Sequence, residues 1–261
     1  MTTVIVPVDF SSTSLHAAEY AAQLLVGHYG VTLILYHSYA KPADEAEALE
    51  ELEALKASLQ QDHIVKIEIL NHLEPDFVDG LERAARHRNA DLVIMGITGK
   101  SAIAQVFFGS NTLKMAATKA CPVLIVPEGA VYSPLNDVLL TSDFKNTLNT
   151  TPSVPIKNFL SAFKPTLHVI NVDKDHYISL TESYEKEKQD LKKMFEGYNP
   201  EFYFMRLYEV EEALNMFIED KKIDLIIAIQ KNHSFMEKLF QRSHTKSLSY
   251  HSKIPILVIH E

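Results

Sequence analysis

The sequence predicts an α/β protein of two tandem, doubly wound domains, each a five-stranded, mostly parallel sheet with helices on both faces. Three observations support this prediction. The 261 residues are enough for two domains of about 130 residues each. Short runs of Val, Ile and Leu alternate with helix-like stretches, as in parallel sheets that are covered on both faces. The C-terminal half also repeats the pattern of the N-terminal half.

The repeat is clearest between residues 91–128 and 224–261, which align without gaps at an offset of 133. Ten of the 38 aligned pairs are identical, among them Asp91/Asp224 and Pro122/Pro255. A period of this length indicates two copies of one domain rather than a solenoid of short units. We therefore predict one domain over residues 1–130 and a second over residues 131–261.

The elements of the N-terminal copy follow from its hydrophobic pattern. Ser11 to Ser14 can cap a helix that runs to Leu25, and Pro75 suits the first turn of a helix through Leu81. Crossover helices between parallel strands give the doubly wound arrangement. The strand-like runs are Val4–Val8, Val31–Tyr36, Ile64–Ile69, Leu92–Met95 and Val123–Val126, and a leucine stripe (Leu52, Leu55, Leu59) marks a further helix.

Composition and charge exclude several classes of partner. The formal net charge is −9, so the chain lacks the basic surface that nucleic acid binding needs, and an anionic membrane would repel it. No apolar run approaches the roughly 20 residues of a membrane span, and Met1–Asp9 resembles a strand rather than a signal peptide. The one cysteine, Cys121, excludes an intramolecular disulfide framework. We expect a cytoplasmic protein.

The strongest functional signal is a glycine-containing loop after the run Leu92–Met95. Gly96-Ile97-Thr98-Gly99 follows this run, and Gly109-Ser110-Asn111-Thr112 then opens an apolar helix, capped by Ser110 or Asn111. Ligands of open parallel sheets bind at the carboxyl ends of strands, and glycine allows close approach to the backbone. The helix N-terminus favours an anion, and the hydroxyls of Thr98, Ser110 and Thr112 can donate to phosphate oxygens. The loop predicts a phosphate site, with a simple tight turn as the alternative.

The spacing Gly96-x2-Gly99-x9-Gly109-Ser110 resembles the nucleotide-binding motif of the universal stress protein family. The segments Val4–Asp9 and Cys121–Pro127 also look like that family, and the resemblance extends over both copies. The resemblance implies a Rossmann-like fold of the adenine nucleotide alpha hydrolase type. It also implies that the chain binds ATP, or AMP or ADP, with Mg²⁺ as a further candidate. The loop is not a Walker motif, because no Gly-Lys-[Ser/Thr] follows the right glycine spacing.

The resemblance also implies roles for individual residues. Asp9, after Pro7 and Val8, would contact the sugar or base, and its alternative role is to cap the following helix. Ser38 would line the adenine pocket, and Met95 would pack on the base or belong to the core. No catalytic or metal-binding residue is predicted. The predicted nucleotide-binding set is Pro7, Val8, Asp9, Ser38, Met95, Gly96, Thr98, Gly99, Gly109, Ser110, Asn111 and Thr112.

The C-terminal copy breaks this motif. Ile229, Asn232 and Arg242 stand where the first copy has Gly96, Gly99 and Gly109, and only Ser243 and Thr245 keep the polar pattern. We predict that this copy has lost the site.

We predict a nucleotide-binding protein that couples ATP occupancy to a stress response. Two alternatives stay open: a slow ATPase or phosphotransferase in the same cleft, and a scaffold with vestigial binding. Hydrolysis needs metal-assisted charge neutralisation, and beside Asp9 the sequence shows no second acidic ligand or general base. The family resemblance implies pairing through the final strand. We therefore expect the two copies to pair within one chain through Val123–Val126 and Ile256–Ile259, with a homodimer of chains as a further option.

Overall fold

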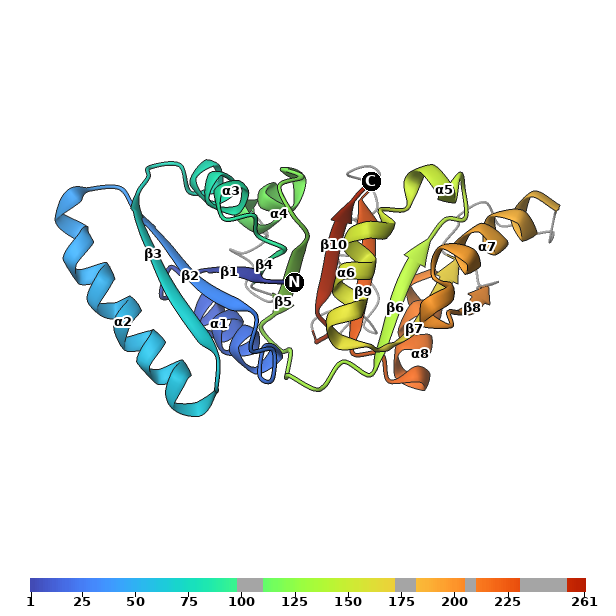
Figure 1. The fold of residues 1–261 in the computed structure, drawn as a ribbon, viewed down its shortest axis with the longest axis horizontal. Coiled ribbons are helices and arrows are strands. Elements are labelled where there is room, and N and C mark those ends of the chain that lie inside the picture. The colour runs from blue at the N-terminus through green and yellow to red at the C-terminus, as the bar shows by residue number, and fades with distance from the viewer. Residues whose placement is uncertain (98–109, 172–181, 205–209, 231–252) are drawn as a thin grey trace. The chain divides into compact units, whose positions relative to one another are not determined.

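The structure is a computed structural model that describes residues 1–97, 110–171, 182–204, 210–230 and 253–261 (Figure 1). It divides into two compact units, Met1–Tyr132 and Ser133–Glu261. Within the described residues, no helix combines the length and the apolar character needed to cross a membrane.

The N-terminal unit is a five-stranded sheet in the order β3-β2-β1-β4-β5, and its strand pairs are parallel. From β1 the chain first moves outward to β2 and β3, and then returns to β4 and β5 on the other side. Helices α1 and α2 cover one face of the sheet, and α3 and α4 cover the other (Figure 1). The order therefore switches direction between β1 and β4, which is where open sheets bind ligands. The elements are β1 (Thr3–Pro7), α1 (Ser12–Leu24), β2 (Thr32–Tyr39), the 3₁₀ turn η1 (Pro42–Asp44), α2 (Glu45–Asp62), β3 (Lys66–Leu73), α3 (Phe77–His87), β4 (Leu92–Ile97), α4 (Ser110–Ala117) and β5 (Val123–Pro127).

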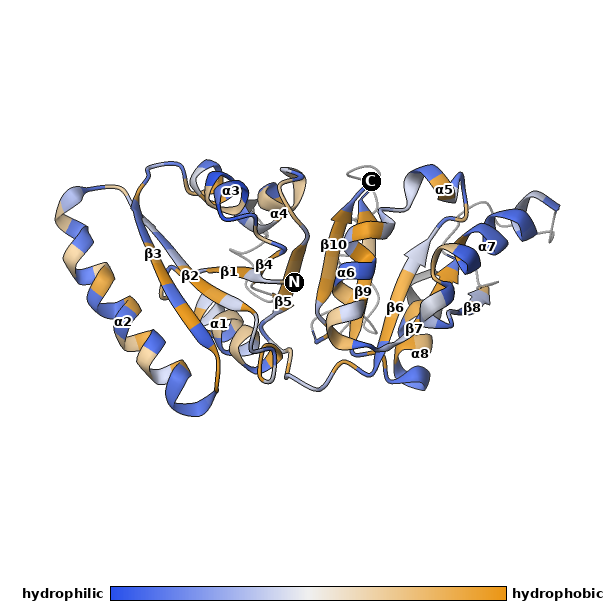
Figure 2. Ribbon diagram, in the orientation of Figure 1, coloured by the Kyte–Doolittle hydropathy of each residue, from blue (hydrophilic) through white to orange (hydrophobic). Residues whose placement is uncertain are grey.

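The hydrophobic runs of the sequence form the core strands, as Figure 2 shows by their colour. Val4 to Val6 in β1 and Val93 and Ile94 in β4 are fully buried. The edge strand β3 is different, because it begins at Lys66 and not at Ile64, which is 76% exposed. Lys66 pairs with Thr32, the first residue of β2, so the run before Lys66 has no strand to pair with.

The ends of three helices test the capping predictions. Ser11 caps α1, and its hydroxyl accepts a hydrogen bond from the Ser14 amide, as predicted. The prediction for Pro75 is wrong, because Asp76 is the cap of α3 and Pro75 precedes it. Asp76 Oδ1 accepts from the amides of Val78 and Asp79, both at 3.0 Å.

Helix α4 begins at Ser110, so Asn111 lies inside its first turn and is not the cap. The helix ends at Ala117. Lys119 adopts a left-handed conformation with φ 58°, which no helix can continue through.

The C-terminal unit repeats the topology, with its sheet in the order β10-β9-β6-β7-β8 and parallel pairs. Each strand has its counterpart at the same place in the N-terminal sheet, which confirms the predicted fold class. The elements are β6 (Asp137–Ser142), α5 (Thr147–Thr150), α6 (Ser153–Phe163), β7 (Thr166–Asn171), α7 (Glu182–Met194), the 3₁₀ turn η2 (Glu196–Tyr198), β8 (Glu201–Phe204), α8 (Val210–Lys221), β9 (Leu225–Gln230) and β10 (Ile256–His260).

One identical pair of the repeat, Asp91 and Asp224, has the same structural role in each unit. Asp91 Oδ2 accepts from the amides of Thr2 and Thr3, at 2.6 and 3.1 Å. Asp224 Oδ2 accepts from the amides of Asn136 and Asp137, at 2.8 and 3.0 Å. Each carboxylate thus ties the residue before the fourth strand of its unit to the start of the first strand.

We expect the Asp91→Ala variant to lose about 1–3 kcal/mol of unfolding free energy at pH 7, because two amides lose a charged acceptor. Burial alone would raise the pKa of Asp91, but the hydrogen bonds from Thr2 and Thr3 outweigh it and hold the pKa below its ordinary value. A lowered pKa stabilises the fold above the unfolded value of about 3.9 and ceases to do so as the pH falls through the folded value.

Urea unfolding at pH 7 and pH 3 measures this difference, which should shrink at the lower pH. The exposed Glu128 provides a control variant, Glu128→Ala, in the same unit. Equal urea midpoints for Asp91→Ala and the native chain at pH 7 would contradict the assigned role.

Candidate functional site

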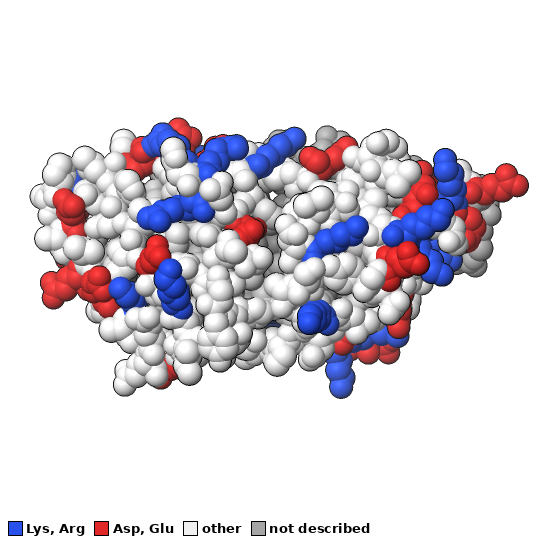
Figure 3. All heavy atoms as spheres, viewed as in Figure 1, with Lys and Arg blue, Asp and Glu red and all other residues white. Residues whose placement is uncertain are grey.

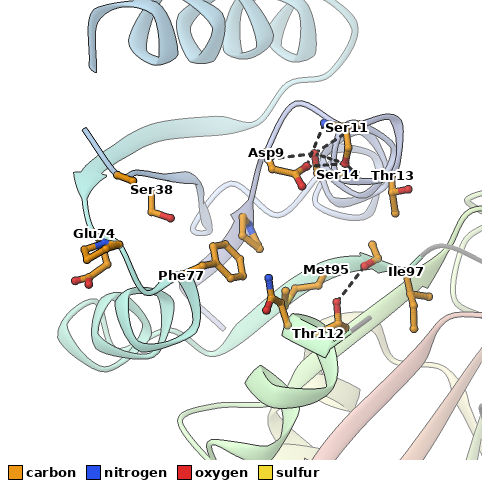
Figure 4. Close-up of a pocket in the computed structure, with 15 residues that line it drawn as sticks. Asp9, Ser11, Thr13, Ser14, Ser38, Glu74, Phe77, Met95, Ile97 and Thr112 are labelled. Atoms are coloured by element: carbon orange, nitrogen blue, oxygen red, sulfur yellow. Dashed lines mark hydrogen bonds between the residues drawn. The ribbon is translucent and has the colours of Figure 1, made fainter. Parts of the chain in front are cut away.

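A cavity of about 420 Å³ lies at the carboxyl ends of the strands in the N-terminal unit (Figure 4). The ends of β1, β2 and β4 contribute to its wall, together with the first turns of α1 and α4 and the segment between β3 and α3. The cavity therefore lies where the strand order switches direction. Its lining is Pro7, Asp9, Ser11, Thr13, Ser14, Ser38, Ala40, Glu74, Pro75, Phe77, Met95, Gly96, Ile97, Asn111 and Thr112.

The structure brings seven of the predicted binding residues together around this cavity. Val8 is not one of them, because it is 2% exposed and belongs to the core between Pro7 and Asp9, which do line the cavity. Ser110 begins α4, but its side chain lies outside the described part of the chain, as do Thr98, Gly99 and Gly109. The seven that line the cavity are Pro7, Asp9, Ser38, Met95, Gly96, Asn111 and Thr112.

Asp9 belongs to a hydrogen-bond network at the start of α1. Its Oδ1 accepts from the Ser11 amide at 3.1 Å and from the Ser11 hydroxyl at 2.6 Å, and its own amide donates to Ser14 Oγ at 3.2 Å. Partial burial would raise the pKa of Asp9, but the hydrogen bonds from Ser11 and Ser14 outweigh it, so the pKa is lowered. Asp9 thus presents an ionised carboxylate to the cavity, while Ser11 is the residue that caps the helix.

Gly96 has a packing role that the sequence did not reveal. A Cβ at this position would lie 2.4 Å from the carbonyl oxygen of Thr13 and 2.6 Å from its Cγ2. The missing side chain therefore lets the first turn of α1 pack directly against the end of β4. The glycine that sequence reasoning assigned to ligand approach is required by the fold itself.

Thr112 lies in the cavity wall, but its hydroxyl is engaged. Thr112 Oγ1 donates to the carbonyl oxygen of Gly96 at 3.2 Å, and the residue is 4% exposed. This bond fastens the first turn of α4 to the end of β4. In this conformation the hydroxyl proton is directed at that carbonyl oxygen, and its donation to a phosphate oxygen stays a prediction.

Sequence reasoning missed the contribution of the segment between β3 and α3. Glu74 and Phe77 line the cavity (Figure 4). Glu74 also forms an ion pair with Arg83. Ligands bind at the carboxyl ends of parallel strands, and this rule also applies to β3. The rule could therefore have identified the segment after β3 as part of the site. The other missed lining residues are Ser11, Thr13, Ser14, Ala40, Pro75 and Ile97.

The chemistry of the lining is mixed. Phe77 and Met95 give an apolar surface, Asp9 gives a negative charge that can accept from hydroxyl groups, and Asn111 lies in the first turn of a helix. Such a site can hold a flat apolar ring and a polar, hydroxylated group together. The described residues contain no group of three or more His, Cys, Asp or Glu side chains that could hold a metal ion.

The corresponding region of the C-terminal unit is built differently. Ile229 takes the place of Gly96 and is 6% exposed, so this position carries a buried side chain where the N-terminal unit has none. In place of the continuous helix α1 this unit has the single turn α5, a break at Thr151 and Pro152, and then α6. Asn232, Arg242, Ser243 and Thr245 lie outside the described residues.

Comparisons with known proteins agree with this geometry. The model of the universal stress protein family matches residues 1–127. A universal stress protein of Thermus aquaticus is 29% identical over 134 residues, which are 48% of this chain and 97% of that protein.

Two solved structures extend the comparison. A universal stress protein from Archaeoglobus fulgidus superposes with a TM-score of 0.70 at 19% identity and covers 99% of this chain and 98% of its own, which shows the same fold. A universal stress protein in complex with cAMP is 30% identical, covers 48% of this chain and 95% of its own, and has a TM-score of 0.41. Residues 1–127 are therefore a domain of the universal stress protein family.

Proposed function

We propose that the N-terminal unit binds one adenine nucleotide, ATP or its products ADP and AMP, in the cavity between β1 and β4. The observation that carries this proposal is the position of the cavity at the switch in strand order, between the two described flanks of the glycine loop. Gly96 lies before the loop, and Asn111 and Thr112 lie after it in the first turn of α4. The volume of about 420 Å³ is within the range of small-molecule sites.

The lining suggests how the nucleotide would lie. Its base would contact the apolar side chains of Phe77 and Met95, with Ser38 at the edge of the ring. The ribose hydroxyls would donate to the carboxylate of Asp9, whose lowered pKa keeps it ionised at neutral pH. The phosphates would point to the N-terminus of α4 and the glycine loop, where unpaired amides and the helix dipole favour negative charge.

The state of the polar side chains favours binding over hydrolysis. Phosphoryl transfer needs metal-assisted charge neutralisation and a positioned water molecule. Asp9 Oδ1 is occupied by Ser11, and Glu74, the other carboxylate of the described lining, is paired with Arg83. We therefore infer that Mg²⁺ would enter with the phosphates of ATP. We also infer that the protein signals nucleotide occupancy in a stress response. A slow ATPase and a scaffold with vestigial binding are the competing outcomes of the experiment.

We expect one nucleotide per chain, bound by the N-terminal unit. Calorimetric titration of the full chain with ATP, ADP, AMP and cAMP measures the number of sites and ranks the ligands. Single-turnover assays with radiolabelled ATP then distinguish a binding protein, which leaves ATP intact, from a slow ATPase. Two equivalent sites would contradict the prediction of a single site, which depends on the difference between Gly96 and Ile229. If no nucleotide bound, the scaffold would be the remaining alternative.

Assembly is a further proposal from the sequence. Each unit ends in an apolar strand that would lie at a sheet edge, where pairing satisfies exposed amide and carbonyl groups. We propose that the two units pair with each other through these strands, and that chains can also form a homodimer.

A further inference from the structure

A second cavity of the N-terminal unit, of about 390 Å³, lies between β3 and α3. Apart from Glu74 it shares no lining residue with the proposed nucleotide cavity. Its polar lining comes from three elements: Tyr36 from β2, His72 from β3, and Arg83, His87 and Arg88 from α3 and its end. In the nucleotide hypothesis none of these five residues contacts the nucleotide.

The lining of this cavity has two arginines and one glutamate. Lys and Arg side chains gather over α3 in Figure 3, and Arg83 and Arg88 are the two that line the cavity. Glu74 is the one acidic lining residue, and its charge is balanced by the ion pair with Arg83. Arg88 forms a long ion pair with Glu68 on β3, 3.6 Å from Nη1 to Oε2. An incoming anion would therefore meet a guanidinium that is only loosely paired.

The inner wall of the cavity holds a buried hydroxyl that lacks a hydrogen bond. Tyr36 is 1% exposed, and its phenolic oxygen has no hydrogen-bond partner of acceptable geometry. Burial raises its pKa, and the polar contact with the Ser38 side chain and the charge of Arg83 offset this only in part. The phenol therefore stays protonated at neutral pH and can donate to a ligand. A buried polar group without a partner is rare enough to require an explanation.

Gly80 lies against this hydroxyl, and Gly80 and Tyr36 both line the cavity. It occupies the interior of α3, where glycine is unfavourable compared with alanine. A Cβ at Gly80 would lie 2.5 Å from Tyr36 Oη and 2.5 Å from Glu74 Cγ. The helix thus leaves out a side chain at the point where the phenol and the ion pair meet.

We propose that this cavity is a binding site for a phosphate group, either free phosphate or a small phosphomonoester. The phenol of Tyr36 donates to one phosphate oxygen, and the guanidinium groups of Arg88 and Arg83 donate to the others. A phosphate has enough acceptor oxygens for donors on β2 and α3 at once, and arginine suits phosphate geometry. Leu70 and Ala84 in the same lining provide apolar contact for the carbon part of an ester.

Calorimetric titration with inorganic phosphate and with phenyl phosphate tests this site. The full chain carrying Gly109→Arg is used as the background, so that phosphate binding in the nucleotide cavity does not contribute. We expect Tyr36→Phe and Arg88→Gln each to weaken binding by about 10-fold to 150-fold, the effect of one lost hydrogen bond to a charged group. Tighter binding of phenyl phosphate than of inorganic phosphate would identify the ligand as an ester, and the reverse as free phosphate.

Arg86→Gln is the matched control. Arg86 lies on the same helix and is paired with Glu82, but it does not line the cavity. It should leave affinity unchanged although it removes the same charge as Arg88→Gln. Thermal unfolding of each variant shows that the fold is retained. The proposal would be overturned if the Arg88→Gln protein bound phosphate as tightly as the protein with native Arg88, or if Arg86→Gln weakened binding as much as Arg88→Gln. It would also be overturned if no binding were found up to about 20 mM phosphate.

Discussion

Replacing Gly109 with arginine should abolish nucleotide binding, with a loss in affinity of at least about 100-fold, and leave the fold intact. Gly109 directly precedes α4, whose first turn supplies Asn111 and Thr112 to the cavity wall. A side chain at this position would occupy the space in front of the helix N-terminus, where the phosphates are proposed to lie. The aligned residue of the C-terminal copy is Arg242, so the repeat itself carries the substitution.

Calorimetric titration with ATP measures the effect, and thermal unfolding measures the fold. Gly30→Arg is the matched control, because it adds the same side chain at an exposed glycine where a Cβ would meet no atom within 4 Å. Native affinity in a normally folded Gly109→Arg protein would show that the loop is only a turn. Loss of affinity in both variants would point to a general effect of added charge.

The second large effect is expected at Gly96. Gly96→Ala should lower the free energy of unfolding by about 1–3 kcal/mol, the usual range for forcing extra atoms into a packed interior. The new methyl group would lie 2.4 Å from a backbone oxygen of Thr13, so α1 would have to move away from β4. Because Asp9 and Ser11 are bound to the start of that helix, we also expect weaker nucleotide binding.

Urea unfolding provides the measurement, and Gly30→Ala is the control. Gly30 has open space around it, so this substitution should change stability by no more than about 0.5 kcal/mol. Unlike Gly27, which has φ +85°, Gly96 has no left-handed backbone to strain. A loss of stability at Gly96 would therefore come from the contact with Thr13, and a fully stable Gly96→Ala protein would disprove that this contact is tight.

Most of the fold could be predicted because its signals are local. Val4 to Val6 and Leu92 to Met95 form buried strands, since continuous β-branched and aliphatic runs suit a sheet that is covered on both faces. Ser11 caps α1 because a hydroxyl three residues before a helical amide satisfies it. Where the local signal was weaker, the observed element boundaries differ from the predicted ones. Strand β3 begins two residues after Ile64, and the cap of α3 is Asp76.

The candidate site was predictable in part. Carboxyl ends of parallel strands meet at one edge of a sheet, so Asp9, Ser38 and Met95 line one cavity although they are far apart in the sequence. Glu74 and Phe77 reach the same cavity from a segment with no recognisable motif. Their position depends on the length of β3 and on the entry angle of α3, which a single sequence does not specify.

The amino-acid sequence by itself determined the repeat, the parallel α/β fold and the glycine spacing, because these depend on hydrophobic period and on backbone freedom at single residues. Only the tertiary structure decided why Gly96 must be a glycine, that the Thr112 hydroxyl binds its carbonyl oxygen, and that Gly80 leaves room for the Tyr36 hydroxyl. Each of these depends on the distance between two elements that are separate in the chain. Such distances arise only when the helices pack against the sheet.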